Sequence, residues 1–200
     1  MAEGQNCADY DEGTFRATLR DIRALSREEP ATFLPRMTEL CNLAGVAFVV
    51  VRPLPKTALS GVARWLTPRR ALIQQSLRHK SDDHFWFTFF HEAAHLLQHS
   101  KRAIYVDDDG ADPNSEEHEA NQWAREHLIA KTSFAQFANE MNFSERTIRK
   151  FAETQGISAG IVVGMLQHDN AIPWRTPLNR LKCRFNWADD PASGVETIVT

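Results

Sequence analysis

The spacing of apolar positions divides the chain into a helical beginning, a short β region and a long helical end. Apolar residues recur every three to four positions over 12–26, and again between Pro30 and Gly45, which predicts two amphipathic helices. The period then changes, because VAFVVVR (46–52) is nearly continuously apolar and β-branched, as in a buried strand. Two further strands are expected at 58–66 and 71–78, and RAIYV after residue 100 is a strand-like stub.

Helical periodicity returns after this β region and continues to the end of the chain. The helices expected there are 84–99, 115–130, 132–141, 144–155, 158–168 and a last one over 177–187. The pattern predicts an α+β fold with a small, mainly antiparallel sheet of about three strands and a helical C-terminal part. We expect a core over residues 1–130 and a helical extension over 131–200 packed on it.

Composition is that of an ordinary globular protein, with 200 residues, 42% hydrophobic, 24% charged and a net charge of −3. This charge does not call for a nucleic-acid or membrane partner. Three widely spaced cysteines without a CxxC pair favour a reducing compartment and argue against a thiolate zinc site. MAEGQNCADYDEG does not have the pattern of a signal peptide, and VAFVVV is too short to span a bilayer. A cytoplasmic location is expected.

The segment FHEAAHLLQH carries the most specific chemistry in the sequence. His91 and His95 are four residues apart, so on a helix both imidazoles lie on one face and can bind one metal ion. Glu92 is placed to act on a water at that ion as a general base. His99 lies about 12 Å along the axis from His91, too far to share the ion, and is expected to be a partner at the helix end.

A catalytic zinc needs a third protein ligand, which NSEEHEANQWAREHLI can supply. The buried face expected for this helix consists of Ala120, Trp123, Ala124, His127 and Leu128. Glu116 and Glu119 border that face and both are candidates, with Glu119 favoured, whereas Glu117 is expected to point away. His118 is a further option as an outer-sphere group. Tyr105, His118 and His168 are candidate second donors to the substrate carbonyl.

FWFTFFHEAAHLLQH followed by EEHEANQWAREHLI resembles the ImmA/IrrE family of metallo-endopeptidases. Members carry an HExxH helix and a later E-A-N-x-[FW]-A segment whose glutamate is the third zinc ligand. The resemblance implies a zincin-like core that binds Zn²⁺ through His91, His95 and Glu119, with Glu92 as the base. The thermolysin-like pattern fits less well, because it places an Asp where this chain has Trp123.

The likeness extends over residues 10–187 to regulators that join a helix-turn-helix to such a domain, labelled HigA-type or XRE-family antitoxins. No helix-turn-helix precedes it in this sequence, so both a standalone protein and a piece of a longer regulator fit. The family implies cleavage of a protein, usually a helix-turn-helix repressor, which releases stress, mobile-element or defence genes. The alternative is a sensor domain that binds metal or a ligand without cleavage.

The tail SERTIRKFAETQGISAGIVVGMLQ itself has the look of a helix-turn-helix. Its second helix, SAGIVVGMLQ, has no Arg or Lys to meet phosphate. Direct DNA binding by this tail is therefore not expected.

Overall fold

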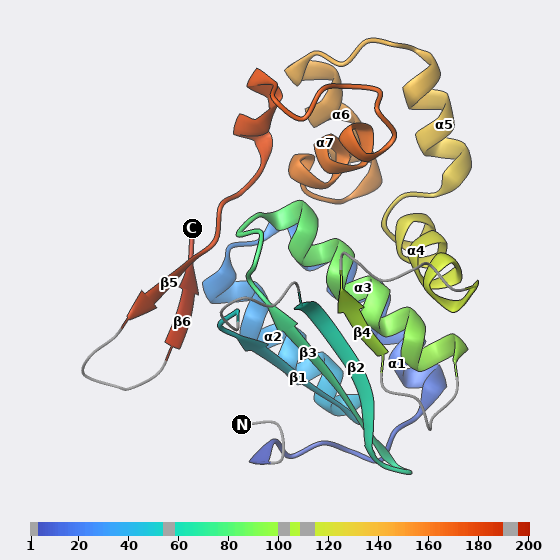
Figure 1. The fold of residues 1–200 in the computed structure, drawn as a ribbon, viewed down its shortest axis with the longest axis vertical. Helices are drawn as coiled ribbons and strands as arrows, with labels where there is room; N and C mark the ends of the chain where they lie inside the picture. Colours follow the sequence, from blue (N-terminus) through green and yellow to red (C-terminus); the bar gives the residue numbers. More distant parts are fainter. Residues whose placement is uncertain (1–3, 54–58, 100–104, 109–114, 190–195) are drawn as a thin grey trace.

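The protein is an α+β fold in which a four-stranded sheet packs against helices and a helical C-terminal part follows (Figure 1). This computed structural model describes residues 4–53, 59–99, 105–108, 115–189 and 196–200. The helices are α1 (Glu12–Ala24), α2 (Pro30–Leu43), α3 (Asp82–Gln98), α4 (Ser115–Leu128), α5 (Lys131–Asn139), α6 (Glu145–Gln155) and α7 (Ala159–His168), with 3₁₀ turns η2 (Leu25–Arg27) and η3 (Pro177–Leu181). The strands are β1 (Val46–Val51), β2 (Leu59–Thr67), β3 (Arg70–Ser76), β4 (Tyr105–Asp108), β5 (Asn186–Asp189) and β6 (Glu196–Val199).

Side-chain caps account for where several helices begin and end. The Asp11 carboxylate accepts a hydrogen bond from the Thr14 backbone N–H at 2.7 Å and starts α1. Ser144 and Ser158 cap α6 and α7 in the same way. Gly156 ends α6 in the left-handed region, at φ 68°, where a residue without Cβ is favoured. The helices expected between residues 12 and 168 are confirmed, with boundaries close to those that the apolar periodicity predicts.

The sheet has strand order β1-β3-β2-β4. β2 and β3 form an antiparallel hairpin, and β4 pairs antiparallel with β2. β3 pairs parallel with β1. The mainly antiparallel character is confirmed. About three strands were expected and the sheet has four, since the strand-like stub joins it as β4 beside β2.

The main hydrophobic core lies where α1, α2 and α3 meet one face of the sheet. Phe15, Phe33 and Phe89 come from the three helices and meet Phe48 and Ile73 of the sheet, all at most 2% exposed. The same core continues into α6 and α7, so the extension packs on the core region. The division at residue 130 stays a prediction. Within the described ranges, no helix is both long and apolar enough to cross a bilayer.

The prediction of a last helix over 177–187 is wrong. Helical structure is limited there to the 3₁₀ turn η3, and the chain then forms β5, which pairs with β6. The reason lies in partners far away in sequence. Arg184 bridges Ser81 in antiparallel fashion, and the Phe185 N–H donates to the Lys80 carbonyl at 3.0 Å. Backbone groups used in this way are not available to a helix.

Residues 182–185, which we call the strap, tie the start of α3 to the end of the chain. The Asp82 carboxylate accepts from the Cys183 N–H at 3.0 Å and from the Ser158 hydroxyl at 2.7 Å. Lys182 Nζ lies 2.5 Å from an Asp83 carboxylate oxygen. A Cβ on Gly160 of α7 would lie 2.3 Å from Asp82 Oδ1, so only glycine allows this approach. The strap and α7 together fix the N-terminal end of α3.

Candidate metal centre

α3 carries the motif residues into the interior because most of its surface is apolar. Trp86, Phe89 and Phe90 are completely buried, and the following turn is buried with them. His91 and His95 are each 2% exposed, and Glu92 is 0% exposed. Three ionisable side chains in one buried turn are costly in an apolar core unless they bind a partner. Their burial points to a site rather than to a solvated helix face.

Glu117 of α4 closes a cluster with the two imidazoles. Its carboxylate oxygens lie 3.1 Å from His91 Nε2 and 3.4 Å from His95 Nε2, and the two Nε2 atoms are 3.0 Å apart. Bond lengths of about 2.0–2.1 Å at a tetrahedral zinc place ligand atoms roughly 3.3 Å from one another. The three atoms therefore have the spacing that one ion requires, and these residues fit a metal cofactor.

The outer ring nitrogens show which face of each histidine is available to a metal. His91 Nδ1 lies 3.0 Å from the Asn121 side-chain oxygen, and His95 Nδ1 lies 2.9 Å from His99 Nδ1. An amide oxygen only accepts, so His91 carries its proton on Nδ1 and directs the Nε2 lone pair at the cluster. Sequence reasoning missed Asn121, although it stands one helical turn after Glu117.

Electrostatics keep the cluster in the protonation state that a metal needs. Burial, assisted by the neighbouring His91, lowers the pKa of His95 to about 4, so this imidazole is neutral at pH 7. The contact with His91 lowers the pKa of Glu117, which is therefore a carboxylate. Two imidazoles and one carboxylate form a donor set that fits a metal ion.

Glu92 lies one position round α3 from His91 and faces β2. A Cβ added to Gly61 of β2 would lie 2.3 Å from Glu92 Oε1 and 2.8 Å from its Cδ. Only glycine leaves room for this carboxylate between strand and helix. The sequence alone does not single out Gly61, because the contact depends on how β2 packs on α3.

The structure corrects the expected orientation of the acidic residues on α4. Glu119 has a 63% exposed side chain and lies 3.7 Å from His99 Nε2, whereas Glu117 faces His91 and His95. At about 100° per residue, Glu117 is within about 20° of Ala124, a completely buried residue seven positions later. Glu119 is about 140° from Ala124. The expectation that Glu117 points away was wrong, and the placement does not favour Glu119.

The other candidates lie apart from this cluster. Glu116 is half-buried and does not belong to the group of ligand atoms found among the described residues. His118 is exposed. His168 Nδ1 lies 3.3 Å from an Arg125 nitrogen, in a surface network with Asp169. The side chain of Tyr105 is outside the described residues.

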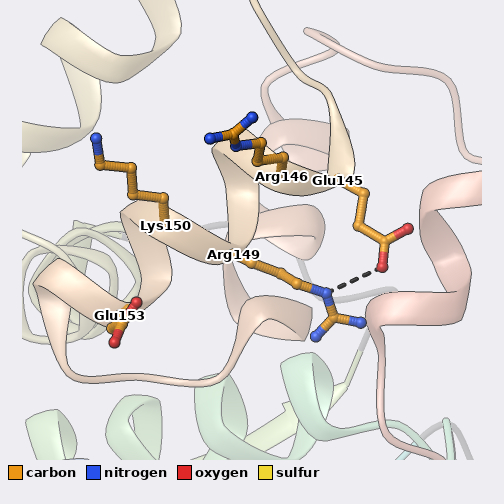
Figure 2. Close-up of a pocket in the computed structure, with 5 residues that line it drawn as sticks. All are labelled: Glu145, Arg146, Arg149, Lys150 and Glu153. Carbon is orange, nitrogen blue, oxygen red and sulfur yellow. Dashed lines mark hydrogen bonds and ion pairs between the residues drawn. The ribbon is translucent and has the colours of Figure 1, made fainter.

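Apart from the buried cluster, the surface of α6 has a pocket lined by charged side chains (Figure 2). Arg146, Arg149 and Lys150 line it together with Glu145 and Glu153. Arg149 Nε lies 2.9 Å from Glu145 Oε1, so part of the positive charge is neutralised. α7, the second helix of the apparent helix-turn-helix, is buried against the core for most of its length. The expectation that this tail does not bind DNA directly stays a prediction.

A comparison with protein families places these observations in context. The model of the IrrE N-terminal-like domain, a peptidase family, matches residues 48–167. The match includes α3 and α4 and therefore all residues of the cluster. No curated protein matches the sequence significantly.

Proposed function

The chain belongs to the IrrE N-terminal-like peptidase family, and from that premise we propose that it is a zinc-dependent endopeptidase that cleaves a regulatory protein. The observation that carries the proposal is the buried His91–His95–Glu117 cluster with Glu92 beside it. Three protein ligands leave a fourth tetrahedral position for water or substrate, which is the arrangement of catalytic rather than structural zinc. Glu117, not Glu119, is proposed as the third ligand.

Zinc suits this site better than other common ions. Two imidazole nitrogens with one carboxylate oxygen are a ligand set known for zinc, whereas Mg²⁺ and Ca²⁺ prefer six or more oxygens. When bound, the ion supplies Lewis-acid polarisation and lowers the pKa of water. The chain's own part in the reaction falls to Glu92. Its carboxylate accepts the proton of the attacking water and returns it to the nitrogen of the leaving amine.

The proposed substrate is a helix-turn-helix repressor in the cytoplasm, cut so that stress, mobile-element or defence genes are released. This part rests on the resemblance to ImmA/IrrE peptidases. The burial of Glu92 favours cleavage over the alternative of a non-cleaving sensor domain of an XRE-family regulator. Holding a carboxylate in the interior is costly, and a site that only binds metal does not need this residue.

The test combines zinc content with cleavage of helix-turn-helix regulators encoded beside the gene, each purified and incubated with the protein. The zinc-loaded wild type is expected to cut one of them at a defined bond. Glu92→Gln is expected to hold equal zinc and to cut at least about 100-fold more slowly, because the general base is lost. Glu116→Gln, also acidic and outside the cluster, is the matched control and should cut normally.

Two results would contradict the proposal. If Glu92→Gln cuts as fast as the wild type, Glu92 is not the base. If the wild type binds zinc and leaves every regulator intact, the sensor-domain alternative takes its place.

A further inference from the structure

We propose that His99 is a positioning residue that holds His95 in its metal-binding tautomer, within a relay that ends at the Glu119 carboxylate. The inference rests on the proposed metal centre and deepens it. It gives a role to two residues that lie beside the ligand cluster without entering it.

The contacts run in one direction away from the cluster. His95 Nδ1 lies 2.9 Å from His99 Nδ1, and His99 Nε2 lies 3.7 Å from a Glu119 carboxylate oxygen. The side chain of His99 is only 4% exposed although it stands at the C-terminal cap of α3. Its backbone N–H donates to the His95 carbonyl at 3.2 Å, and its own backbone is extended. The helix therefore ends with the His99 ring held against the His95 ring.

Proton bookkeeping assigns the roles of the four ring nitrogens. A neutral imidazole carries one N–H, so His95 can offer a lone pair at Nε2 only if Nδ1 holds the proton. His99 Nδ1 must then accept that proton's hydrogen bond, which places the proton of His99 on Nε2. That nitrogen faces the negative charge of Glu119. With an ion bound, each ring would thus hold the tautomer that suits its neighbours, from the Glu119 carboxylate to the cluster.

The two ligand histidines are therefore oriented by different means. His91 is fixed by an amide oxygen, which has no alternative protonation. His95 depends on a second imidazole, which can accept or donate at Nδ1 according to its own tautomer. The Glu119 carboxylate favours the His99 tautomer with the proton on Nε2. Because Glu119 is mostly exposed, solvent weakens this electrostatic effect, and loss of Glu119 should weaken zinc binding by no more than about fivefold. The larger effect should follow from loss of His99.

The experiment measures zinc affinity by competition with a chromophoric chelator in the full chain. Loss of an outer partner of a ligand histidine weakens metal binding by about 10–100-fold, and this is the range expected for His99→Leu. His99→Asn keeps an acceptor near the position of Nδ1 and should restore most of the affinity. His118→Leu, an exposed histidine on α4, is the matched control and should bind as the wild type does.

A second readout needs no metal. Proton–nitrogen correlation spectra of the histidine rings report the tautomer of His95 in the metal-free protein. The wild type and His99→Asn are expected to show the same population of the Nδ1-protonated form of His95, and His99→Leu is expected to show a smaller one. A purely structural role of His99 would not be rescued selectively by Asn and would leave the tautomer unchanged.

Failure of the inference can be distinguished from failure of the proposed function. Equal zinc affinity in the wild type and His99→Leu overturns the inference and leaves the metal centre intact. If the wild type itself takes up no zinc, the proposed function fails. The ring spectra then decide on their own, since an unchanged His95 tautomer in His99→Leu overturns the positioning role.

Discussion

The third ligand can be identified by one pair of substitutions on α4, Glu117→Gln and Glu119→Gln. A four-ligand zinc site contributes about 10–16 kcal/mol, or roughly 2.5–4 kcal/mol per ligand. Glutamine keeps a weakly binding carbonyl oxygen, so we take the lower end of this range. Each 1.4 kcal/mol of binding free energy corresponds to about a tenfold change in the dissociation constant. Glu117→Gln should thus weaken zinc binding by about 60-fold or more, because Glu117 is the proposed third ligand.

Glu119→Gln is the matched control, with the same chemical change two residues away. Its carboxylate is mostly exposed and touches only the outer ring of His99, which limits the loss to about 1 kcal/mol, or fivefold. The assay is chelator competition at pH 7. Equal losses in the two variants, or a larger loss in Glu119→Gln, would refute the geometry and return the third-ligand role to Glu119.

Two further predictions concern packing and pH. Gly61→Ala should keep the zinc affinity but slow cleavage about 100-fold, because the new Cβ displaces Glu92 by about 1 Å. The control is Gly160→Ala, whose new Cβ overlaps Asp82 to the same extent. It should lower the thermal midpoint without slowing cleavage of a regulator that the wild type cuts. Burial raises the pKa of Asp82 from 3.8 to about 6, so the folded state holds this proton more tightly than the unfolded state. As the pH rises from 4 to 6, the free energy of unfolding of the wild type should therefore fall by about 2–3 kcal/mol relative to that of Asp82→Asn. Urea unfolding at each pH measures this difference, and parallel pH profiles of the two proteins would contradict it.

Sequence reasoning succeeded for the part of the site that lies on one element. His91, Glu92 and His95 share a helical turn, so their relative placement follows from the helix repeat alone, although their roles at a metal are still proposals. The acidic residue facing them depends on the rotation of α4 against α3. Ala124 gave the correct phase, and the error lay in not counting seven residues back from it to Glu117.

The residues that support the site were less accessible to sequence reasoning. Gly61 meets Glu92 only because β2 packs on α3, and Asn121 meets His91 only because α4 does. The presence of a glycine in a strand or an asparagine in a helix does not predict which distant residue it contacts. The end of the chain was mispredicted for the same reason, since its local pattern is helical while its hydrogen-bond partners precede α3.

The contacts of the strap also form late during synthesis of the polypeptide. Synthesis reaches the end of α3 after about half of the chain, but Lys182 and Cys183, which hold the first turn of that helix, are made some 80 residues later. Until residues 182 and 183 have been synthesised, the first turn of α3 lacks these two contacts. A chain shortened before residue 182 would therefore keep His91, His95 and Glu117 but lack the contacts that fix the N-terminal end of α3.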